Sequence, residues 1–125
     1  MQPAEINDLY AEQGSTFDQP FKVLGDNGLP VDLTTFNIRG QVRKKYSDTN
    51  PTLTFRFDTT PAGLLTGDFN SHLTAAQLAD TAKGSYVYDV EIYYNTTDLV
   101  PEEIVYKVAK GSFIIGPEVT KPVVP

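Results

Sequence analysis

Hydrophobic and polar residues alternate most clearly in the segment 84–94. One parity is polar, with Asp89 and Glu91. The other parity is apolar or aromatic, and its members are Tyr86, Tyr88, Val90, Ile92 and Tyr94. A period of two residues is typical of a β-strand with one buried and one wet face. The segment therefore predicts a strand on the surface of a two-layer β fold.

The same alternation recurs along the chain, in residues 17–23, 36–46, 53–57, 69–73 and 104–108. Pro20 cannot donate a ladder hydrogen bond, so the strand that contains it is expected at a sheet edge or with a bulge. Asp26-Asn27-Gly28 predicts a tight turn. Phe113 and Ile115 have the opposite parity to residues 104–108, which places a bulge at Gly111. Many short strands with turn signals between them favour an all-β sandwich.

One short helix is predicted at residues 75–82. Thr74 and Gln77 have the spacing of a capping box, and the alanines that follow favour helix. Gly84 stands where a helix would end. Two turns are unstable alone, so we expect Leu78 to anchor the helix to the sheets.

The alternation also predicts the core and the outer charges. We expect a core made of Phe55, Phe57, Tyr88, Val90, Ile92, Tyr106 and Val108. The polar faces of the predicted strands carry complementary charges, so we expect side-chain pairs across the outside of a sheet. One set is Arg39, Arg43 and Arg56, and the other is Asp89, Glu91 and Lys107.

The two ends of the chain lack this pattern. We divide the chain into an N-terminal arm at 1–8, a β-sandwich domain at 9–116 and a C-terminal arm at 117–125. The prolines of the C-terminal segment favour an extended chain that stays outside the domain's own sheet. Extended arms can dock on other proteins. The candidate assembly contacts are Pro3, Ile6, Pro117, Val119, Pro122, Val123 and Val124.

Composition narrows the function classes. The chain has 125 residues, a net charge of −6 and no cysteine. Disulfides and thiolate metal sites are therefore excluded, and the absence of a basic stripe argues against binding to nucleic acid. No apolar run is long enough for a transmembrane helix, and residues 1–5 lack the features of a signal peptide. We expect a protein that is made and used without translocation.

Few residues have the spacing that catalysis or metal binding needs. His72 is the only histidine, and adjacent Ser71 would point to the opposite face of a strand. Asp48 and Asn50 lack the rest of a calcium loop, and the neighbouring carboxylates Glu102 and Glu103 would point apart. The sequence therefore predicts no catalytic residue, no cofactor and no metal site.

The tyrosines raise a second possibility, since aromatic rings stack on sugars. Tyr86, Tyr88 and Tyr94 are better explained by core packing, which leaves Tyr46 and Tyr93 as the more exposed candidates. A glycan-binding role therefore stays open as an alternative.

Several blocks in order resemble small virion proteins of tailed phages. They are residues 13–17, 28–34, 38–47, 73–77, 86–91, 111–113 and 117–120. The pattern is similar to the N-terminal domain of phage baseplate upper proteins, in chains of the cyanophage and marine phage type. The likeness covers about residues 9–121. It implies an immunoglobulin-like β-sandwich.

The resemblance implies a non-enzymatic virion structural protein, associated with the tail or baseplate and working through protein–protein contacts. Its partners would be other phage virion proteins, with multiple copies in a symmetric assembly and neither nucleic acid nor membrane bound. Its location would be the virion, assembled in the bacterial host cytoplasm. Two alternatives stay open, a capsid decoration (cement) protein and a glycan-binding module for host attachment.

Overall fold

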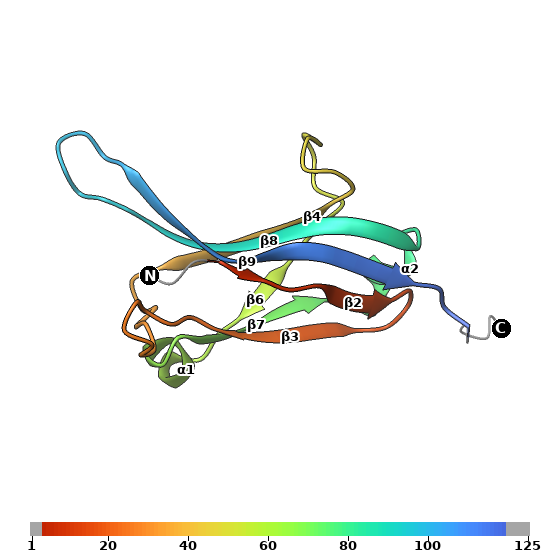
Figure 1. Ribbon diagram of the computed structural model, residues 1–125, viewed down its shortest axis with the longest axis horizontal. Coiled ribbons are helices and arrows are strands. Elements are labelled where there is room, and N and C mark those ends of the chain that lie inside the picture. The colour runs from red at the N-terminus through yellow and green to blue at the C-terminus, as the bar shows by residue number, and fades with distance from the viewer. Residues whose placement is uncertain (1–3, 120–125) are drawn as a thin grey trace.

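Two β-sheets lie face to face in the computed structural model, which describes residues 4–119 (Figure 1). The six-stranded sheet contains β1 (Glu5–Ile6), β9 (Glu103–Gly116), β8 (Gly84–Asn95), β4 (Asn37–Arg43) and β5 (Leu53–Thr54) in that order, with β2 (Leu9–Glu12) also paired to β9. The three-stranded sheet has the order β3 (Phe17–Lys22), β7 (Asp68–Leu73) and β6 (Arg56–Asp58). The predicted all-β sandwich is confirmed. Within residues 4–119, no helix has the length and apolar character to cross a membrane.

The core lies between the two sheets and is rich in aromatic rings. Phe17 contacts Phe113 with 5.2 Å between ring centroids, and Phe55 lies 6.0 Å from the same ring. The members of the predicted core that are buried are Phe55, Tyr88, Val90 and Ile92, and Phe57 and Val108 pack against them half-buried. Tyr106 was placed in the core wrongly, because its side chain is 36% exposed.

A bulge does separate the two halves of β9, but its position differs from the prediction. Val90 pairs with Ala109 and Glu91 pairs with Lys107, so Val108 is the extra residue. The change of parity along β9 is therefore real, and it occurs before Gly111. Gly111 has another role: a Cβ built on it would lie 2.1 Å from the carbonyl oxygen of Asn7.

The N-terminal strands β1 and β2 both run parallel to β9. Between them the Asn7 amide donates to the Lys110 carbonyl at 3.0 Å, and the Tyr88 hydroxyl donates to the Asn7 carbonyl at 2.8 Å. Burial, helped by the charges of Glu5 and Asp8, raises the pKa of Tyr88 to about 12. The sheet therefore extends into the segment 1–8, where the sequence indicated an arm.

The predicted helix is present as α2 (Ala75–Ala79), and its capping box between Thr74 and Gln77 is formed in both directions. Leu78 is fully buried, as expected. The helix is shorter than the predicted 75–82, since its C-cap is Asp80, and Gly84 begins β8 instead of ending the helix.

A second helix, α1 (Pro61–Leu65), forms in addition to the one short helix that the sequence predicted. Thr60 caps it by accepting from the Gly63 amide, with Pro61 in the first turn. Two local predictions are confirmed elsewhere. Pro20 lies in the edge strand β3, and Gly28 takes a positive φ of 77° in its turn.

Candidate functional site

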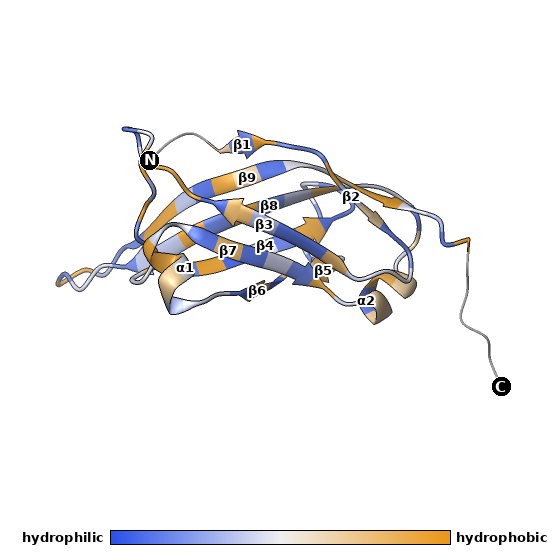
Figure 2. Ribbon diagram, turned by 90° about the horizontal axis from the view of Figure 1, so that it is seen from below, coloured by the Kyte–Doolittle hydropathy of each residue, from blue (hydrophilic) through white to orange (hydrophobic). Residues whose placement is uncertain are grey.

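The β8–β9 hairpin projects beyond the rest of the sandwich (Figures 1 and 2). It carries two strongly exposed apolar residues, Leu99 and Val100. The two strands are paired as far as Asn95 and Glu103, and the Thr96 amide donates to the Glu102 carbonyl at 2.8 Å. Beyond that point the loop presents Leu99 and Val100 to solvent, and Leu99 is fully exposed. Exposed apolar patches mark contact surfaces for other proteins, so this pair at a protruding tip is a candidate contact surface.

Aromatic contacts brace the hairpin near the place where it leaves the sandwich. The ring of Phe36 lies 5.3 Å from Tyr94 on β8 and 6.4 Å from Tyr106 on β9, edge to face in both cases. On the opposite face the Arg39 guanidinium lies 4.1 Å from the centroid of the Tyr93 ring. These contacts fix the direction in which the hairpin points.

The expected assembly contacts at the chain ends fall into two groups. Ile6 on β1 is 75% exposed, Pro117 is exposed and Val119 is 93% exposed. Pro117 and Val119 line a shallow hollow with the turn at 12–15. Pro3, Pro122, Val123 and Val124 lie outside the described residues 4–119.

A charge network covers the outer face of the six-stranded sheet. Glu91, which is nearly buried, accepts from both Arg39 and Lys107. Lys107 also reaches Asp89 at 2.9 Å, and Arg39 reaches Glu103 at 2.7 Å. Burial opposes ionisation of Glu91, but these cations outweigh it and hold the pKa of its carboxyl below the ordinary value. The predicted outer pairing is therefore present for Arg39, Asp89, Glu91 and Lys107.

The other two arginines do not join this network. Arg43 donates to the side chain of Gln41, and Arg56 lies on the three-stranded sheet, where it pairs with Asp58 at 3.0 Å. Sequence parity places these side chains on an outer face, but it does not say which of the two sheets they belong to.

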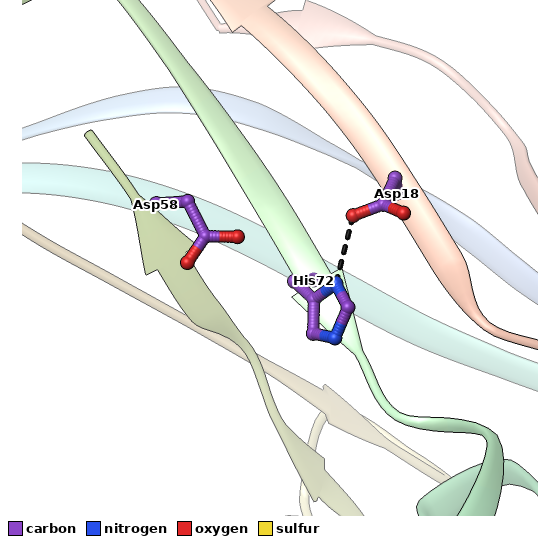
Figure 3. A group of neighbouring side chains, drawn as sticks. All are labelled: Asp18, Asp58 and His72. Carbon is purple, nitrogen blue, oxygen red and sulfur yellow. Dashed lines mark hydrogen bonds and ion pairs between the residues drawn. The ribbon is translucent and has the colours of Figure 1, made fainter. Parts of the chain in front are cut away.

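The outer face of the three-stranded sheet carries a second polar cluster (Figure 3). His72 Nδ1 lies 2.7 Å from Asp18 Oδ1, and the Asn70 amide donates to the same oxygen at 2.9 Å. The hydrogen bond with His72, followed by that from Asn70, lowers the pKa of Asp18. Arg56 likewise lowers the pKa of Asp58. Ligand atoms of Asp18, Asp58 and His72 all lie within 4.8 Å of one another.

The structure gives other partners to the residues of the sites that the sequence argued against. Ser71 is buried and donates to the Gln19 carbonyl, on the opposite face of β7 from His72. Asp48 accepts from the Lys45 amide within its own turn. Glu103 pairs with Arg39 at 2.7 Å.

The tyrosine expectations are met in part. Tyr46 is exposed, as predicted, and Tyr86 and Tyr88 are buried. Tyr93 is only half-exposed, and Arg39 covers one face of its ring.

No known family model and no curated protein matches this chain. A similarity is found to a solved structure of a family 123 glycoside hydrolase from Clostridium perfringens, described for glycolipid glycan hydrolysis. It has a TM-score of 0.36 and 12% sequence identity, and it spans 92% of this chain but 23% of that protein. At this TM-score the similarity bears on neither fold nor function.

Sequence reasoning missed both the hairpin tip and the histidine cluster. The signal for the tip was Leu99-Val100-Pro101, an apolar interruption of the polar run 95–103. The signal for the cluster was the outward parity of Asp18, Asp58 and His72, which sequence places on separate strands without their register.

Proposed function

We propose that this chain is a non-enzymatic structural component of a phage virion, held at the tail or baseplate by protein–protein contacts. The resemblance in the sequence supplies the setting. The observation that carries the contact role is the projecting β8–β9 hairpin with Leu99 and Val100 exposed at its tip. Assembly of the virion would take place in the host cytoplasm, with several copies per particle.

The tip supports insertion into a partner. Burial of a Leu or Val side chain contributes about 1.5–3 kcal/mol, so a single tip gives a weak contact. Weak contacts of this kind suit a symmetric assembly, because several copies bind one scaffold together and avidity multiplies their effect. Pro101 restricts the loop next to the two aliphatic residues and lowers the entropy lost on docking.

The charges around the hairpin tip indicate which kind of partner surface would bind it. Asp98 and Glu102 flank Leu99 and Val100, and nothing basic lies between residues 84 and 106. A complementary site is an apolar hollow with lysine or arginine at its rim. The partner is therefore a virion protein with such a hollow, repeated by the symmetry of the particle.

The chain ends are secondary candidates for the same role. Ile6 lies on β1, at one edge of the six-stranded sheet, where a partner strand can add by backbone hydrogen bonds. Pro117 and Val119 are exposed beyond the last strand, and the proposed contacts at Pro3, Pro122, Val123 and Val124 follow from sequence alone.

The first test is the position of the protein in purified phage particles, by immunogold labelling and quantitative mass spectrometry. Few or tens of copies at the tail support the proposal. Hundreds of copies on the head would replace it with the capsid decoration role, and absence from particles would reject both.

The second test concerns the hairpin tip. The double variant Leu99→Ser with Val100→Ser should fold normally and be lost from particles by tenfold or more. The matched control is Leu29→Ser, which removes an aliphatic side chain that is 63% exposed in a different turn. Incorporation of the double variant at the level of the control would show that the tip is not the contact.

A further inference from the structure

Three neighbouring strands bring one imidazole and two carboxylates together on the outer face of the three-stranded sheet. Asp18 on β3 pairs directly with His72 on β7, and Asp58 on β6 pairs with Asn70, two positions along β7. His72 therefore lies between the two acids, as Figure 3 shows. Its side chain is only 16% exposed, which restricts the ring to a narrow range of positions.

The ligand types favour one class of ion. Imidazole nitrogen and carboxylate oxygen are ligands of zinc and related first-row metals, and three protein ligands with water in the fourth position make an open tetrahedral site. Calcium and magnesium prefer oxygen ligands throughout. We propose that Asp18, Asp58 and His72 bind one divalent first-row transition-metal ion of the zinc class.

The spacing of the ligand atoms fits this ion after small side-chain rotations. Ligands about 2.0–2.1 Å from a tetrahedral ion lie about 3.3 Å from one another. Here His72 Nδ1 and Asp18 Oδ1 are 2.7 Å apart, and the whole set spans no more than 4.8 Å. The backbone register already places the three residues, so the strands do not have to move.

Arg56 is the competing cation. It binds Asp58 through two nitrogens, at 3.0 and 3.3 Å. Both partners are largely exposed, with side chains 63% and 46% accessible, and such pairs contribute little. A metal ion displaces Arg56 to solvent, while the Asn70 amide continues to orient Asp18 from the outside.

The bound ion would join the two edge strands of the small sheet through its central strand. β6 pairs with β7 over three residues, against six for β3. A shared ligand set adds a link beside the shorter of the two strand pairings in this sheet, so metal binding stabilises the folded state by mass action. This inference does not depend on the proposed virion function.

The test uses tag-free protein, because His72 is the only histidine of the chain and a polyhistidine tag would bind zinc itself. Calorimetric titration with zinc chloride should give one site per chain. Zinc at about 100 times the dissociation constant should raise the melting temperature by about 5–10 °C. Magnesium and calcium chloride at the same concentration should leave it unchanged. The imidazole NMR signals, which belong to one residue, should shift or broaden with zinc.

Variants identify the ligands. His72→Gln, Asp18→Asn and Asp58→Asn should each weaken zinc binding tenfold or more. The control is Asp68→Asn, which removes an exposed carboxylate on β7 that pairs with Lys22 and is not a proposed ligand. This variant should bind zinc as the original chain does. Zinc binding that leaves the His72 signals unmoved, or that survives His72→Gln, would overturn the proposal, as would no binding at millimolar zinc. If a variant does not fold, the NMR result on the unaltered chain decides.

Discussion

The two ends of the β8–β9 ladder follow the same sequence rule and meet opposite surroundings. At the inner end Tyr88, Val90 and Phe113 are buried against the second sheet. At the outer end Tyr106, which has the core parity, is more than a third exposed, and Leu99 is fully exposed. One continuous hairpin is therefore core at one end and free surface at the other.

The difference arises from the length of the opposite sheet. The ladder of β3 with β7 runs only from Phe17–Leu73 to Lys22–Asp68, while β8 and β9 pair over a much longer stretch. Strands that extend past the opposite sheet keep their alternation of apolar and polar residues, but their apolar side chains are no longer buried. Alternation reports which face is apolar, and a second sheet decides whether that face stabilises the fold.

The largest effect is expected at the inner end. Phe113→Ala removes a fully buried ring that contacts Phe17, Phe55 and Tyr88. The free energy of unfolding should fall by about 3–5 kcal/mol, because a cavity remains between the sheets. Urea denaturation measures the change. A loss below about 1 kcal/mol would mean that this end is not the core.

The next effect tests how closely the N-terminal strands approach the ladder. Gly111→Ala places a Cβ against the Asn7 carbonyl, at a backbone φ of 155°. We expect a loss of about 1–3 kcal/mol from overpacking and strain. Gly116→Ala is the control on the same strand, since its Cβ would meet only ordinary contacts at 3.8 Å. Equal melting temperatures for the two variants would contradict the close approach.

The charge network on the outer face of the six-stranded sheet should contribute less to the free energy of unfolding. Glu91→Gln removes the carboxylate shared by Arg39 and Lys107, and the loss should be about 1–2 kcal/mol. The pKa of Glu91 is lower in the folded state than its ordinary 4.5. Its stabilisation is therefore complete above about pH 4.5 and disappears as pH falls through the folded pKa.

Measurement of unfolding free energy against pH checks this sign. The gap between the original chain and Glu91→Gln should close on acidification below pH 4.5. The exposed Glu103→Gln serves as the comparison, with a smaller gap at neutral pH. A gap that widens in acid would contradict the assignment.

The smallest effect is expected at the outer end. Leu99→Ser with Val100→Ser should change the free energy of unfolding by less than about 0.5 kcal/mol, because neither side chain is covered. Chemical denaturation of the purified chain measures it. A loss of more than about 1 kcal/mol would mean that the tip packs against the sandwich and is not a free surface.

Local patterns anticipated most of the fold. The alternation at 84–94 predicted β8, Thr74 and Gln77 predicted the capping box of α2, and Pro20 predicted an edge strand. Each of these depends on neighbours in the chain, so the sequence carries it directly.

What depends on register between distant strands could not be predicted. Tyr106 has the parity of a core residue and pairs with the fully buried Ile92, but it is itself 36% exposed, with the ring of Phe36 beside it. The cluster of Asp18 and His72 requires the pairing of β3 with β7, and Arg56 was assigned to the wrong sheet for the same reason. The sequence predicted the bulge at Gly111 and not at Val108, because a glycine within a strand often marks a bulge and a valine does not.

The parallel pairing of β1 and β2 with β9 has a consequence for the order of folding. Asp8 and Ser112, which meet there, are 104 positions apart in the chain. During synthesis at about 5–20 residues per second, β9 would follow its first partners by about 5–20 s. During this interval Leu9 has not yet met the residues that bury it, so its side chain can bind chaperones and β2 can pair with the wrong strand. Contacts between residues so far apart in the chain make folding slow, on the scale of milliseconds to seconds. We therefore expect the pairing of β1 and β2 with β9 to be a late step in folding.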